Sequence, residues 1–377
     1  MGNCTAKRFE KDGGKEVLKG YFFGFSRWKR NHIRYFFYEL DKKQIVFVNS
    51  VSDALRKGLD IQSSIYIWGK KPFKDVETYA IEYGIPLYRV EDGFIRSISL
   101  GSDLTKGYSL VVDSNGIYFD PTEESDLEIL FNTYHFDQNT LERAKKIKNY
   151  LLKNKISKYN NFTEKTLVLD KHEKGQRIIL VPGQVEDDAS VQYGAEGMTN
   201  LEFLKTVKRN APDAYIIYRP HPDVIAGNRV GHINEKIVEC YCNAIISKVD
   251  LDSVFALTDE VHTMTSLVGF EGLLRGKKVY TYGMPFYAGW GLTIDSKICK
   301  RRKRRLSLEA LIAGAYIVYP RYIHPKNNKQ CEIEELLKVL IEERERYNTQ
   351  KIYRSYINIR NMISRKIQLL IRIILNE

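Results

Sequence analysis

The stretch Thr258–Thr293, TDEVHTMTSLVGFEGLLRGKKVYTYGMPFYAGWGLT, predicts a strand, a helix and a second strand in succession. An extended segment ends at His262, and apolar residues then recur at helical spacing through Leu267–Arg275. Gly276 ends this helix, and Lys277–Tyr282 has the pattern of the next strand. Such a strand–helix–strand unit is the building block of a parallel α/β sheet.

Two hydroxyl residues, Thr265 and Ser266, stand at the start of the predicted helix. Backbone N–H groups without partners and the positive end of the helix dipole gather there, which suits an anion and above all a phosphate. Ordinary N-capping is an equally good interpretation of these two residues taken alone.

Length and composition are those of a folded protein with room for two domains: 377 residues, 43% apolar and 28% charged. No apolar run is long enough to span a bilayer, and the N-terminus lacks the hydrophobic segment of a secretory signal, so we expect a cytoplasmic protein. The five cysteines match no zinc pattern and are expected to be reduced. We expect neither a metal nor a cofactor.

The net charge of +12 is concentrated in the unbroken basic run Lys300–Arg305 and in the tail after Gln350. A basic surface attracts nucleic acid, anionic lipid or an anionic substrate. No RNA-binding signature accompanies the many aromatic residues, so we expect no nucleic-acid partner.

Strands and helices alternate along the first part of the chain. Strands are predicted at Gly20–Phe25, Gln44–Asn49, Ser64–Trp68 and Pro86–Val90, and helices at Ser26–Tyr38, Val51–Lys57 and Phe73–Tyr83. This alternation predicts a parallel sheet with helices on both faces. The sequence Ser114-Asn115-Gly116 predicts a hairpin between Tyr108–Asp113 and Gly116–Phe119.

The polar, lysine-rich stretch Ser157–Gln176 is expected to separate two domains. Beyond it the alternation resumes, with Asn234–Ala244 expected as a helix and Val254–Val261 as a strand. We therefore expect two Rossmann-like domains, 1–160 and 161–330, facing across a cleft, and C-terminal helices with a basic amphipathic tail at 331–377.

Polar groups follow four of the predicted strands, where parallel sheets collect ligands and catalytic residues. They are Glu91-Asp92-Gly93 with Arg96, Glu186-Asp187-Asp188, Arg219-Pro220-His221-Pro222-Asp223, and His262 with Thr265 and Ser266. Each has an alternative interpretation as a turn, a helix cap or a buried structural histidine. The prolines on both sides of His221 stiffen the backbone and orient its imidazole.

These residue types fit glycosyl transfer from an activated sugar. The reaction needs a base for the acceptor hydroxyl, stabilisation of the departing phosphate and, for retention by double displacement, a carboxylate nucleophile. Glu91, Asp92, Asp187 and Asp188 offer carboxylates, and His221, His262, Thr265 and Ser266 offer imidazoles and hydroxyls. The first strand is not followed by a glycine-rich dinucleotide loop, and there is no Walker loop, which argues against dinucleotide oxidation and ATP hydrolysis.

Six segments resemble the capsule polysaccharide β-Kdo transferases of the KpsC type. From about Tyr88 to Pro325 they are, in order, VEDGFIRSISLGSD, VPGQVEDDAS, YRPHPDVIAGNRVG, VHTMTSLVGFEGLLRGK, YGMPFYAGWGLT and RRLSLEALIAGAYIVYPRYIHP. The resemblance implies an α/β fold of two Rossmann-like domains, the GT-B architecture in its sialyltransferase-like variant, with 1–160 on the acceptor side and 161–330 binding the CMP-sugar. It also implies transfer of Kdo from CMP-Kdo, with retention, to a Kdo-bearing glycolipid in capsule linker synthesis.

The same resemblance implies roles for individual residues. His221 and Ser266 would hold the CMP phosphate, and Asp188 would be the nucleophile, with Asp187 as its close rival. Glu91 or Asp92 would handle the proton of the acceptor. The residues expected to bind the CMP-sugar are Arg96, Arg219, His221, Pro222, His262, Thr265, Ser266, Glu271 and Gly283.

The VPGQVEDDAS segment is more similar to the second module of the tandem family members than to the first, which implies a β-2,7 linkage in preference to β-2,4. A lipid-linked acceptor would place the protein at the inner face of the cytoplasmic membrane. There the run Lys300–Arg305 and a basic amphipathic helix at Ile352–Leu375 could meet anionic lipid. The tail could instead pack on the first domain.

Capsule assembly proteins are further expected partners. Two other functions remain open: a transferase for another CMP-nonulosonic acid, and a non-catalytic glycan-binding module in capsule assembly.

Overall fold

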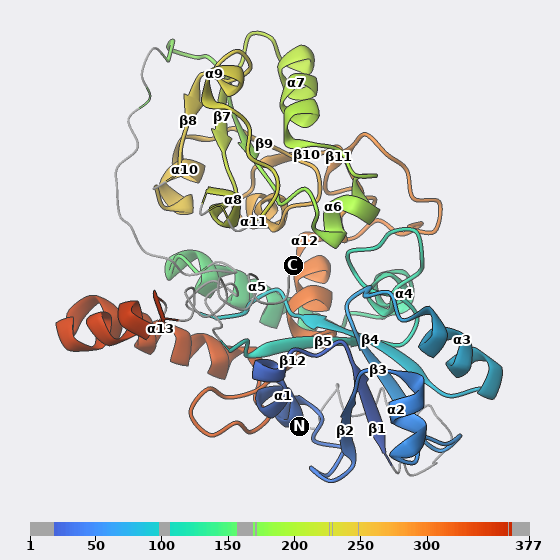
Figure 1. Cartoon of the computed structure of the whole chain (residues 1–377). Helices are drawn as coiled ribbons and strands as arrows, with labels where there is room; N and C mark the ends of the chain where they lie inside the picture. The colour runs from blue at the N-terminus through green and yellow to red at the C-terminus, as the bar shows by residue number, and fades with distance from the viewer. Residues whose placement is uncertain are drawn as a thin grey trace. The chain divides into compact units, whose positions relative to one another are not determined.

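The computed structural model describes residues 19–97, 106–156, 169, 172–225, 227, 229–247, 249–360 and 362–363 (Figure 1). These residues form two compact units. The first unit contains the described residues up to Ile117, those from Ala315 onward, and Ile156. The second unit contains the other described residues from Tyr118 to Gly314. Much of the stretch Ser157–Gln176 lies outside the described residues.

This grouping differs from a division of the chain in sequence order near residue 160. Two helices that precede residue 160, α4 (Asp126–Thr133) and α5 (Gln138–Lys153), belong to the second unit. There α5 packs against α12 (Leu308–Ile312). The chain after Ala315 returns to the first unit and adds β12 (Arg321–Tyr322) to its sheet.

The described sheet of the first unit has the strand order β12-β5-β4-β3-β1-β2. Its other strands are β1 Gly20–Phe23, β2 Ile45–Val48, β3 Ser64–Trp68, β4 Leu87–Asp92 and β5 Ser109–Asp113. Strands β1 to β4 are parallel, whereas β5 is antiparallel to both β4 and β12. The helices of this unit are α1 Arg27–Ile33, α2 Val51–Arg56, α3 Lys74–Tyr83 and α13 Ile333–Thr349, with a 3-10 turn at Arg34–Phe36.

Aromatic residues fill one side of this sheet. The ring of Phe22 stacks on Tyr66 with 4.5 Å between centroids, and Phe37 meets both rings edge-on. Because side chains alternate along a strand, Tyr21 and Phe23 face the other side, where they are also fully buried. A strand buried on both faces explains why β1 is apolar throughout.

The hairpin predicted at Ser114-Asn115-Gly116 is wrong, because β5 pairs with β4 and β12 and no described strand follows it in 114–120. The carboxylate of Asp113 accepts hydrogen bonds from the backbone N–H groups of Asn115 and Gly116, at 3.1 and 2.9 Å. Its other oxygen accepts from the Tyr319 hydroxyl at 2.7 Å. These bonds turn the chain away from the strand instead of back along it.

The second unit has a parallel sheet in the order β11-β10-β9-β6-β7-β8. Its strands are β6 Ile178–Pro182, β7 Tyr215–Arg219, β8 Ala244–Ile245, β9 Glu260–Thr263, β10 Lys278–Thr281 and β11 Ile294–Asp295. Its remaining helices are α6 Ala189–Gly194, α7 Asn200–Asn210, α8 Pro222–Ile225, α9 Glu235–Val238, α10 Leu251–Leu257 and α11 Leu267–Leu274. A π-helix, Ala313–Val318, carries the chain back to the first unit.

Two expected elements of the second unit are wrong. The predicted strand Val254–Val261 is a helix as far as Leu257, because the carboxylate of Asp250 caps α10 by accepting from the Ser253 N–H at 2.9 Å. The predicted helix Asn234–Ala244 ends at Val238. The chain then turns so that the Asn243 N–H can donate to the Ile216 carbonyl beside β7.

The C-terminal tail begins after α13 with a helical segment at 351–360, while residue 361 and residues 364–377 lie outside the described part. One face of this segment touches α13: the Arg346 guanidinium lies 4.3 Å from the Tyr353 ring centroid. Ile352, Tyr356 and Ile359 point away and are 88%, 61% and 53% exposed. Among the described residues, none of the helices combines the length and the apolar character needed to cross a bilayer.

Candidate active site

Four neighbouring strands of the second unit, β10, β9, β6 and β7, run parallel and so end at one edge of the sheet. The loops that follow these strands carry Gly283, Thr265 with Ser266, Glu186–Asp188, and His221. The structure therefore brings most of the polar residues predicted from the second half of the sequence to one sheet edge.

Thr265 is fixed from several sides. The side chain of the buried Gln184 donates to Thr265 Oγ1 at 2.8 Å and accepts from the Thr265 N–H at 2.9 Å. Gly283 lies so close that a Cβ there would come 2.6 Å from the Gly194 carbonyl oxygen and 3.0 Å from the Thr265 methyl group. Sequence reasoning missed Gln184, although it stands in the same short loop as Glu186.

Ser266 caps α11, as its alternative interpretation predicted: its Oγ accepts from the Val268 N–H at 3.2 Å. The buried Tyr287 donates its hydroxyl hydrogen to the Ser266 carbonyl. Gly269 makes this bond possible, because a side chain there would collide with the Tyr287 hydroxyl. The serine hydroxyl keeps its hydrogen available as a donor beside the positive end of the helix.

The two neighbouring aspartates differ in their surroundings. Asp187 is exposed and pairs with the Arg229 guanidinium at 3.1 Å. Asp188 is half-buried and caps α6, with its Oδ1 accepting from the Ser190 N–H at 3.0 Å and from the Ser190 hydroxyl at 2.7 Å. Its second oxygen, Oδ2, takes no part in these bonds, so the cap orients the carboxylate without occupying both of its oxygens.

His221 follows β7, and the Asp223 N–H donates to its Nδ1 at 3.2 Å. In the neutral imidazole, the ring proton therefore lies on Nε2, where it can be donated. Pro222 begins α8 directly behind this histidine. Arg219 is held by the Val249 carbonyl at 2.8 Å, and burial lowers its pKa while the charge of Glu271 acts to raise it.

His262 lies in the sheet and not in the loop beyond it. Its Nδ1 is 3.0 Å from the Tyr282 hydroxyl, its Nε2 is 3.3 Å from a Glu260 carboxylate oxygen, and its ring stacks on Tyr280. Burial lowers the pKa of His262 to about 4, although Glu260 acts in the opposite direction. This geometry is that of the buried structural histidine weighed as its alternative.

We expect this histidine to make the second unit sensitive to acid. An unfolded His262 takes up a proton near pH 6.5, whereas the folded imidazole resists protonation down to about pH 4. The unfolded state binds more protons between these pH values, so the free energy of unfolding falls as the pH falls from about 6.5 to about 4. At about 1.4 kcal/mol for each unit of pKa, the contribution is on the order of 3 kcal/mol.

Urea unfolding at a series of pH values between 7 and 4.5 measures this effect. His262→Gln should show a shallower decline than the unsubstituted chain. A decline of the same steepness in both proteins would contradict the assignment.

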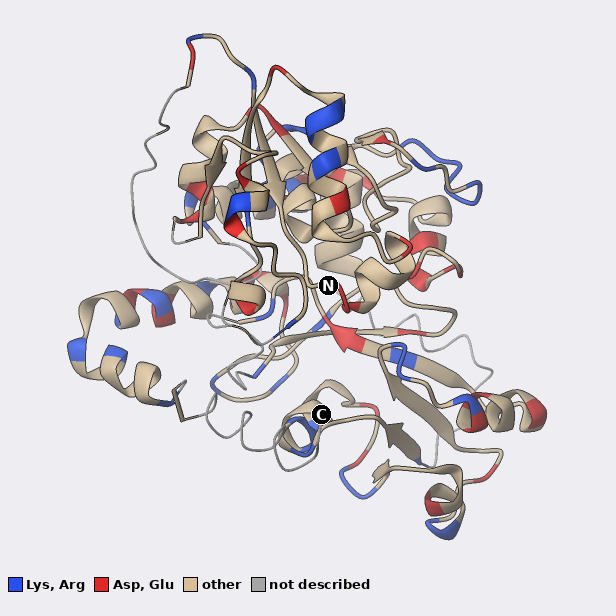
Figure 2. Ribbon diagram, turned by 45° about the horizontal axis from the view of Figure 1, so that its top comes forward, with Lys and Arg blue, Asp and Glu red and all other residues tan. Residues whose placement is uncertain are grey.

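The aromatic loop, which follows β10 and contains Phe286, Tyr287 and Trp290, is anchored by the basic run Lys300–Arg305. Glu128 of α4 binds Arg301 Nε at 2.6 Å and Arg302 Nε at 3.0 Å, and Arg302 also donates to the Pro285 and Ala288 carbonyls. The side chains of Glu128 and Arg302 are each 3% exposed. The run Lys300–Arg305 forms a continuous blue stretch of ribbon in Figure 2, and part of its positive charge is therefore buried inside the protein.

One Asp-x-Asp sequence, Asp250-Leu251-Asp252, has the spacing used for metals in other transferases. Asp250 caps α10, and Asp252 accepts two hydrogen bonds from Arg275 at 2.9 and 2.6 Å. Within the described ranges, no group of three or more histidine, cysteine or carboxylate side chains is placed to hold a metal ion.

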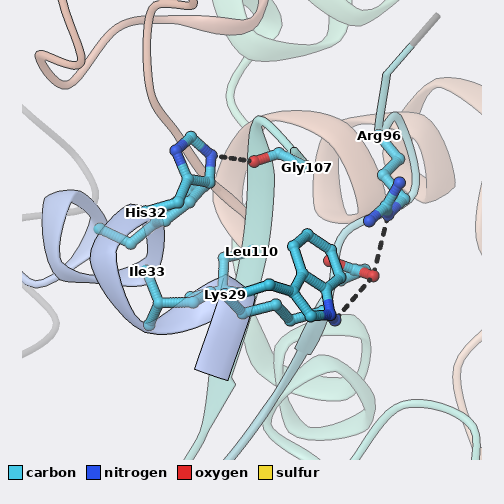
Figure 3. A pocket seen from close by; sticks show the side chains of 9 residues that line it. Lys29, His32, Ile33, Arg96, Gly107 and Leu110 are labelled. Atoms are coloured by element: carbon cyan, nitrogen blue, oxygen red, sulfur yellow. Dashed lines mark hydrogen bonds and ion pairs between the residues drawn. The ribbon is translucent and has the colours of Figure 1, made fainter. Parts of the chain in front are cut away.

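In the first unit, the predicted residues Glu91, Asp92 and Arg96 lie together at the end of β4. Arg96 Nε donates to Asp92 Oδ2 at 2.9 Å, and Lys29 of α1 approaches the same oxygen at 3.5 Å (Figure 3). Glu91 accepts from the Asp92 N–H at 2.9 Å. Sequence reasoning missed Lys29, because nothing in the pattern of α1 marks it as more than a residue on a helix.

Two α/β units, each with polar side chains where its parallel strands end, are the organisation of GT-B glycosyltransferases, and the expected fold class is confirmed. The family described as "Capsule polysaccharide biosynthesis protein" matches residues 63–322. The chain belongs to this family, and the expected resemblance is confirmed.

Among curated relatives, the chain is 44% identical over 343 residues to the capsule polysaccharide modification protein LipA of Neisseria meningitidis serogroup A. That match covers 89% of this chain but 47% of LipA, so the chain spans about half the length of this relative. The lipopolysaccharide-processing protein LpsZ of Rhizobium meliloti is 38% identical, over 83% of this chain and 72% of LpsZ.

Two solved structures of Thermosulfurimonas dismutans KpsC are similar to this chain. The β-Kdo 2,4 transferase is 31% identical with a TM-score of 0.73, over 86% of this chain and 98% of that one. The β-Kdo 2,7 transferase is 35% identical with a TM-score of 0.69, over 86% and 99%.

Proposed function

We propose that this chain is a retaining β-Kdo transferase, which moves Kdo from CMP-Kdo to a Kdo-bearing glycolipid during synthesis of the capsule linker. The observation that carries this proposal is the match to two β-Kdo transferases, each over nearly its whole length. The second unit adds the chemistry that the donor needs, with carboxylate, imidazole and hydroxyl groups at one sheet edge.

We assign the CMP phosphate to the loops after β9 and β7. The Ser266 hydroxyl and the N-terminus of α11 offer hydrogen-bond donors at the positive end of a helix. The imidazole of His221, protonated on Nε2, offers another. The bonds that fix Thr265 and the Ser266 carbonyl support this role, since a rigid anion site loses little entropy on binding.

The reaction then takes two displacements at the anomeric carbon. An Asp188 oxygen attacks this carbon, and the bond to phosphate breaks so that CMP departs with the electron pair. The acceptor hydroxyl next attacks the same carbon, its proton passes to Glu91 or Asp92, and the bond to Asp188 breaks. Each step inverts the configuration, so the product retains it.

Product analysis tests the proposal directly. Purified protein with a Kdo-bearing acceptor should add one Kdo from CMP-Kdo, detected by mass spectrometry, and should add nothing from CMP-sialic acid. Transfer from CMP-sialic acid would point to the other nonulosonic acid, and transfer from neither donor would favour the non-catalytic module.

The two similar KpsC transferases form different linkages, β-2,4 and β-2,7. Sequence identity is higher to the β-Kdo 2,7 transferase, whereas the TM-score is higher to the β-Kdo 2,4 transferase. We keep β-2,7 as the prediction, and the carbon chemical shifts of the acceptor residue in the product distinguish the two linkages.

The tail supports a position at an anionic membrane surface. Its apolar residues Ile352, Tyr356 and Ile359 are spaced as one helical stripe and remain exposed. Lys351 and Arg354 lie in the same segment. An apolar stripe beside basic residues is the pattern of helices that lie in the interface of a bilayer, where each cation contributes roughly 1 kcal/mol.

Deletion of the residues after Gln350 should therefore release the protein from vesicles that contain anionic lipid. Co-sedimentation measures the bound fraction. The variant Ile352→Ser with Ile359→Ser, which keeps every charge, should also bind less, because the apolar contribution is lost. Vesicles of neutral lipid serve as the control. Pelleting that is unchanged by the deletion would rule out this surface.

A further inference from the structure

The side chain of Gln184 joins two loops that serve different parts of the proposed reaction. Gln184 stands in the loop after β6, which also carries Asp188, and it meets Thr265 in the loop after β9. Its Nε2 donates to Thr265 Oγ1 at 2.8 Å, and its Oε1 accepts from the Thr265 N–H at 2.9 Å. Gln184 is 6% exposed, so water has little access to it. The loop of the nucleophile and the loop of the phosphate therefore share a fixed contact.

The direction of the first of these bonds decides what the Thr265 hydroxyl can do. The Thr265 N–H can only donate, so it must face the amide oxygen of Gln184, and the amide nitrogen must then face Thr265 Oγ1. Because an amide N–H donates, Thr265 Oγ1 accepts in this bond and keeps its own hydrogen. None of the described residues accepts a hydrogen bond from this hydroxyl. Its hydrogen is therefore available to a ligand.

Close packing prevents the Thr265 side chain from turning away. A Cβ at Gly194 would come 2.8 Å from its methyl carbon, and a Cβ at Gly283 would come 3.0 Å from the same atom. The methyl group is held against these two glycines, while the hydroxyl oxygen is held by Gln184. The side chain is thus restricted to one χ1 rotamer, and only the hydroxyl hydrogen can still rotate.

Asn200 in turn fixes the backbone of Gln184. Its Oδ1 accepts from the Gln184 N–H at 2.8 Å, and its Nδ2 donates to the Gln184 carbonyl at 2.7 Å. The same Nδ2 donates to the Gly231 carbonyl at 3.0 Å, and the Asn200 N–H donates to a Glu186 carboxylate oxygen at 2.7 Å. Asn200 is 1% exposed. Both polar atoms of its side chain hold the loops, so Gln184 is presented from a rigid base.

We propose that Gln184 is a positioning residue, which holds the Thr265 hydroxyl as a hydrogen-bond donor to the phosphate of the CMP donor. The inference deepens the proposed function and rests on it for the identity of the anion. Thr265 directly precedes Ser266, whose hydroxyl also keeps its hydrogen beside the N-terminus of α11. Two adjacent hydroxyl donors are then available to the phosphate oxygens, where negative charge grows as the bond to the sugar breaks.

The amide group of Gln184 suits this role better than the alternatives of similar length. A carboxylate would accept the Thr265 hydroxyl hydrogen, and its negative charge would repel the phosphate. An apolar side chain would leave the hydroxyl without orientation. A neutral amide directs the hydrogen away from itself and adds no net charge.

Ligand binding without turnover tests this proposal. The full chain is titrated by calorimetry with CMP and with cytidine, which lacks the phosphate. Thr265→Val keeps the shape of the side chain and should weaken CMP about tenfold, because one hydrogen bond to a charged group is lost. Gln184→Met should weaken CMP by a smaller factor, since the hydroxyl remains but is no longer oriented. Both variants should leave the affinity for cytidine unchanged.

The double variant separates positioning from a general effect on the fold. If Gln184 acts through the Thr265 hydroxyl, Gln184→Met should cause no further loss of CMP affinity in the Thr265→Val background. In turnover, Gln184→Met should lower kcat by about tenfold and leave the KM for the acceptor unchanged. Thr206→Val is the matched control, because the Thr206 hydroxyl already donates to the Glu202 carbonyl at 2.8 Å. It should change the affinity for neither ligand.

Gln184→Glu is a second variant, in case Gln184→Met does not fold. The ionised carboxylate still accepts from the Thr265 N–H, but it also takes the hydroxyl hydrogen and adds a negative charge. It should therefore weaken CMP and leave cytidine unaffected. Urea unfolding shows which variants are folded.

A folded Gln184 variant that loses affinity for cytidine as much as for CMP would overturn the proposal, because the whole site would then be disturbed. Losses that multiply in the double variant would overturn it as well. A chain in which the two substitutions are coupled in CMP binding, but which transfers no Kdo, would support the role of Gln184 at the phosphate and refute the transferase function. The two failures are therefore distinguishable.

Discussion

Replacement of Asp188 by Asn should reduce Kdo transfer by about a thousandfold or more, as removal of a covalent nucleophile does in other enzymes. This substitution should remove the nucleophile without disturbing the fold. Asp188 caps α6 through a single oxygen, and Asn is as good a cap as Asp, so the fold should persist. Radiolabelled product formation measures the loss, and calorimetry with CMP-Kdo should show donor affinity retained.

Asp187→Asn is the matched control, because this neighbour is exposed and its pair with Arg229 is a surface pair of small energetic value. It should keep most of the activity. The reverse outcome, with Asp187→Asn inactive and Asp188→Asn active, would move the nucleophile by one residue. Full activity in both variants would refute a covalent intermediate on this loop.

Arg302→Met should destabilise the second unit by about 3–5 kcal/mol, which is the usual cost of removing one partner from a buried ion pair. The Glu128 carboxylate would keep Arg301 but lose its buried partner, and two carbonyls of the aromatic loop would lose their donor. Urea unfolding followed by tryptophan fluorescence reports the change, since Arg302 lies 5.6 Å from the Trp290 ring centroid.

The adjacent Lys303→Met is the control for the loss of one positive charge. Lys303 is exposed, and its substitution should cost less than about 0.5 kcal/mol. If Arg302→Met proved no more harmful than Lys303→Met, the ion pair would not be what anchors the loop. If both variants lost membrane binding to the same extent, that result would instead support the expected contact of Lys300–Arg305 with anionic lipid.

Local sequence patterns predicted the elements around the site well. The stretch Thr258–Thr293 folds into β9, α11 and β10 close to the expected bounds. The spacing of apolar residues and the glycine at position 276 are sufficient for this, because they act over a few residues. The same reasoning could not decide whether Asp188 and Ser266 were caps or reactive groups, because both roles require a polar side chain at a helix start.

Contacts between distant residues explain what the sequence could not predict. The use of Arg301 and Arg302 inside the protein depends on Glu128, more than 170 positions earlier. A basic run that pairs with a buried carboxylate can have the same local sequence as a basic run that faces a membrane. Lys29 was missed for a similar reason, since only the folded chain brings it to Asp92.

The return of the chain to the first unit has a consequence for biosynthesis. The antiparallel edge of that unit is completed by β12, and Asp113 receives its hydrogen bond from Tyr319. The ribosome makes both partners only after the whole of Tyr118–Gly314. The second unit can therefore fold on the nascent chain first, at a stage when β5 cannot yet pair with β12. A polypeptide that terminated near residue 314 would expose the backbone of β5 and be prone to aggregate.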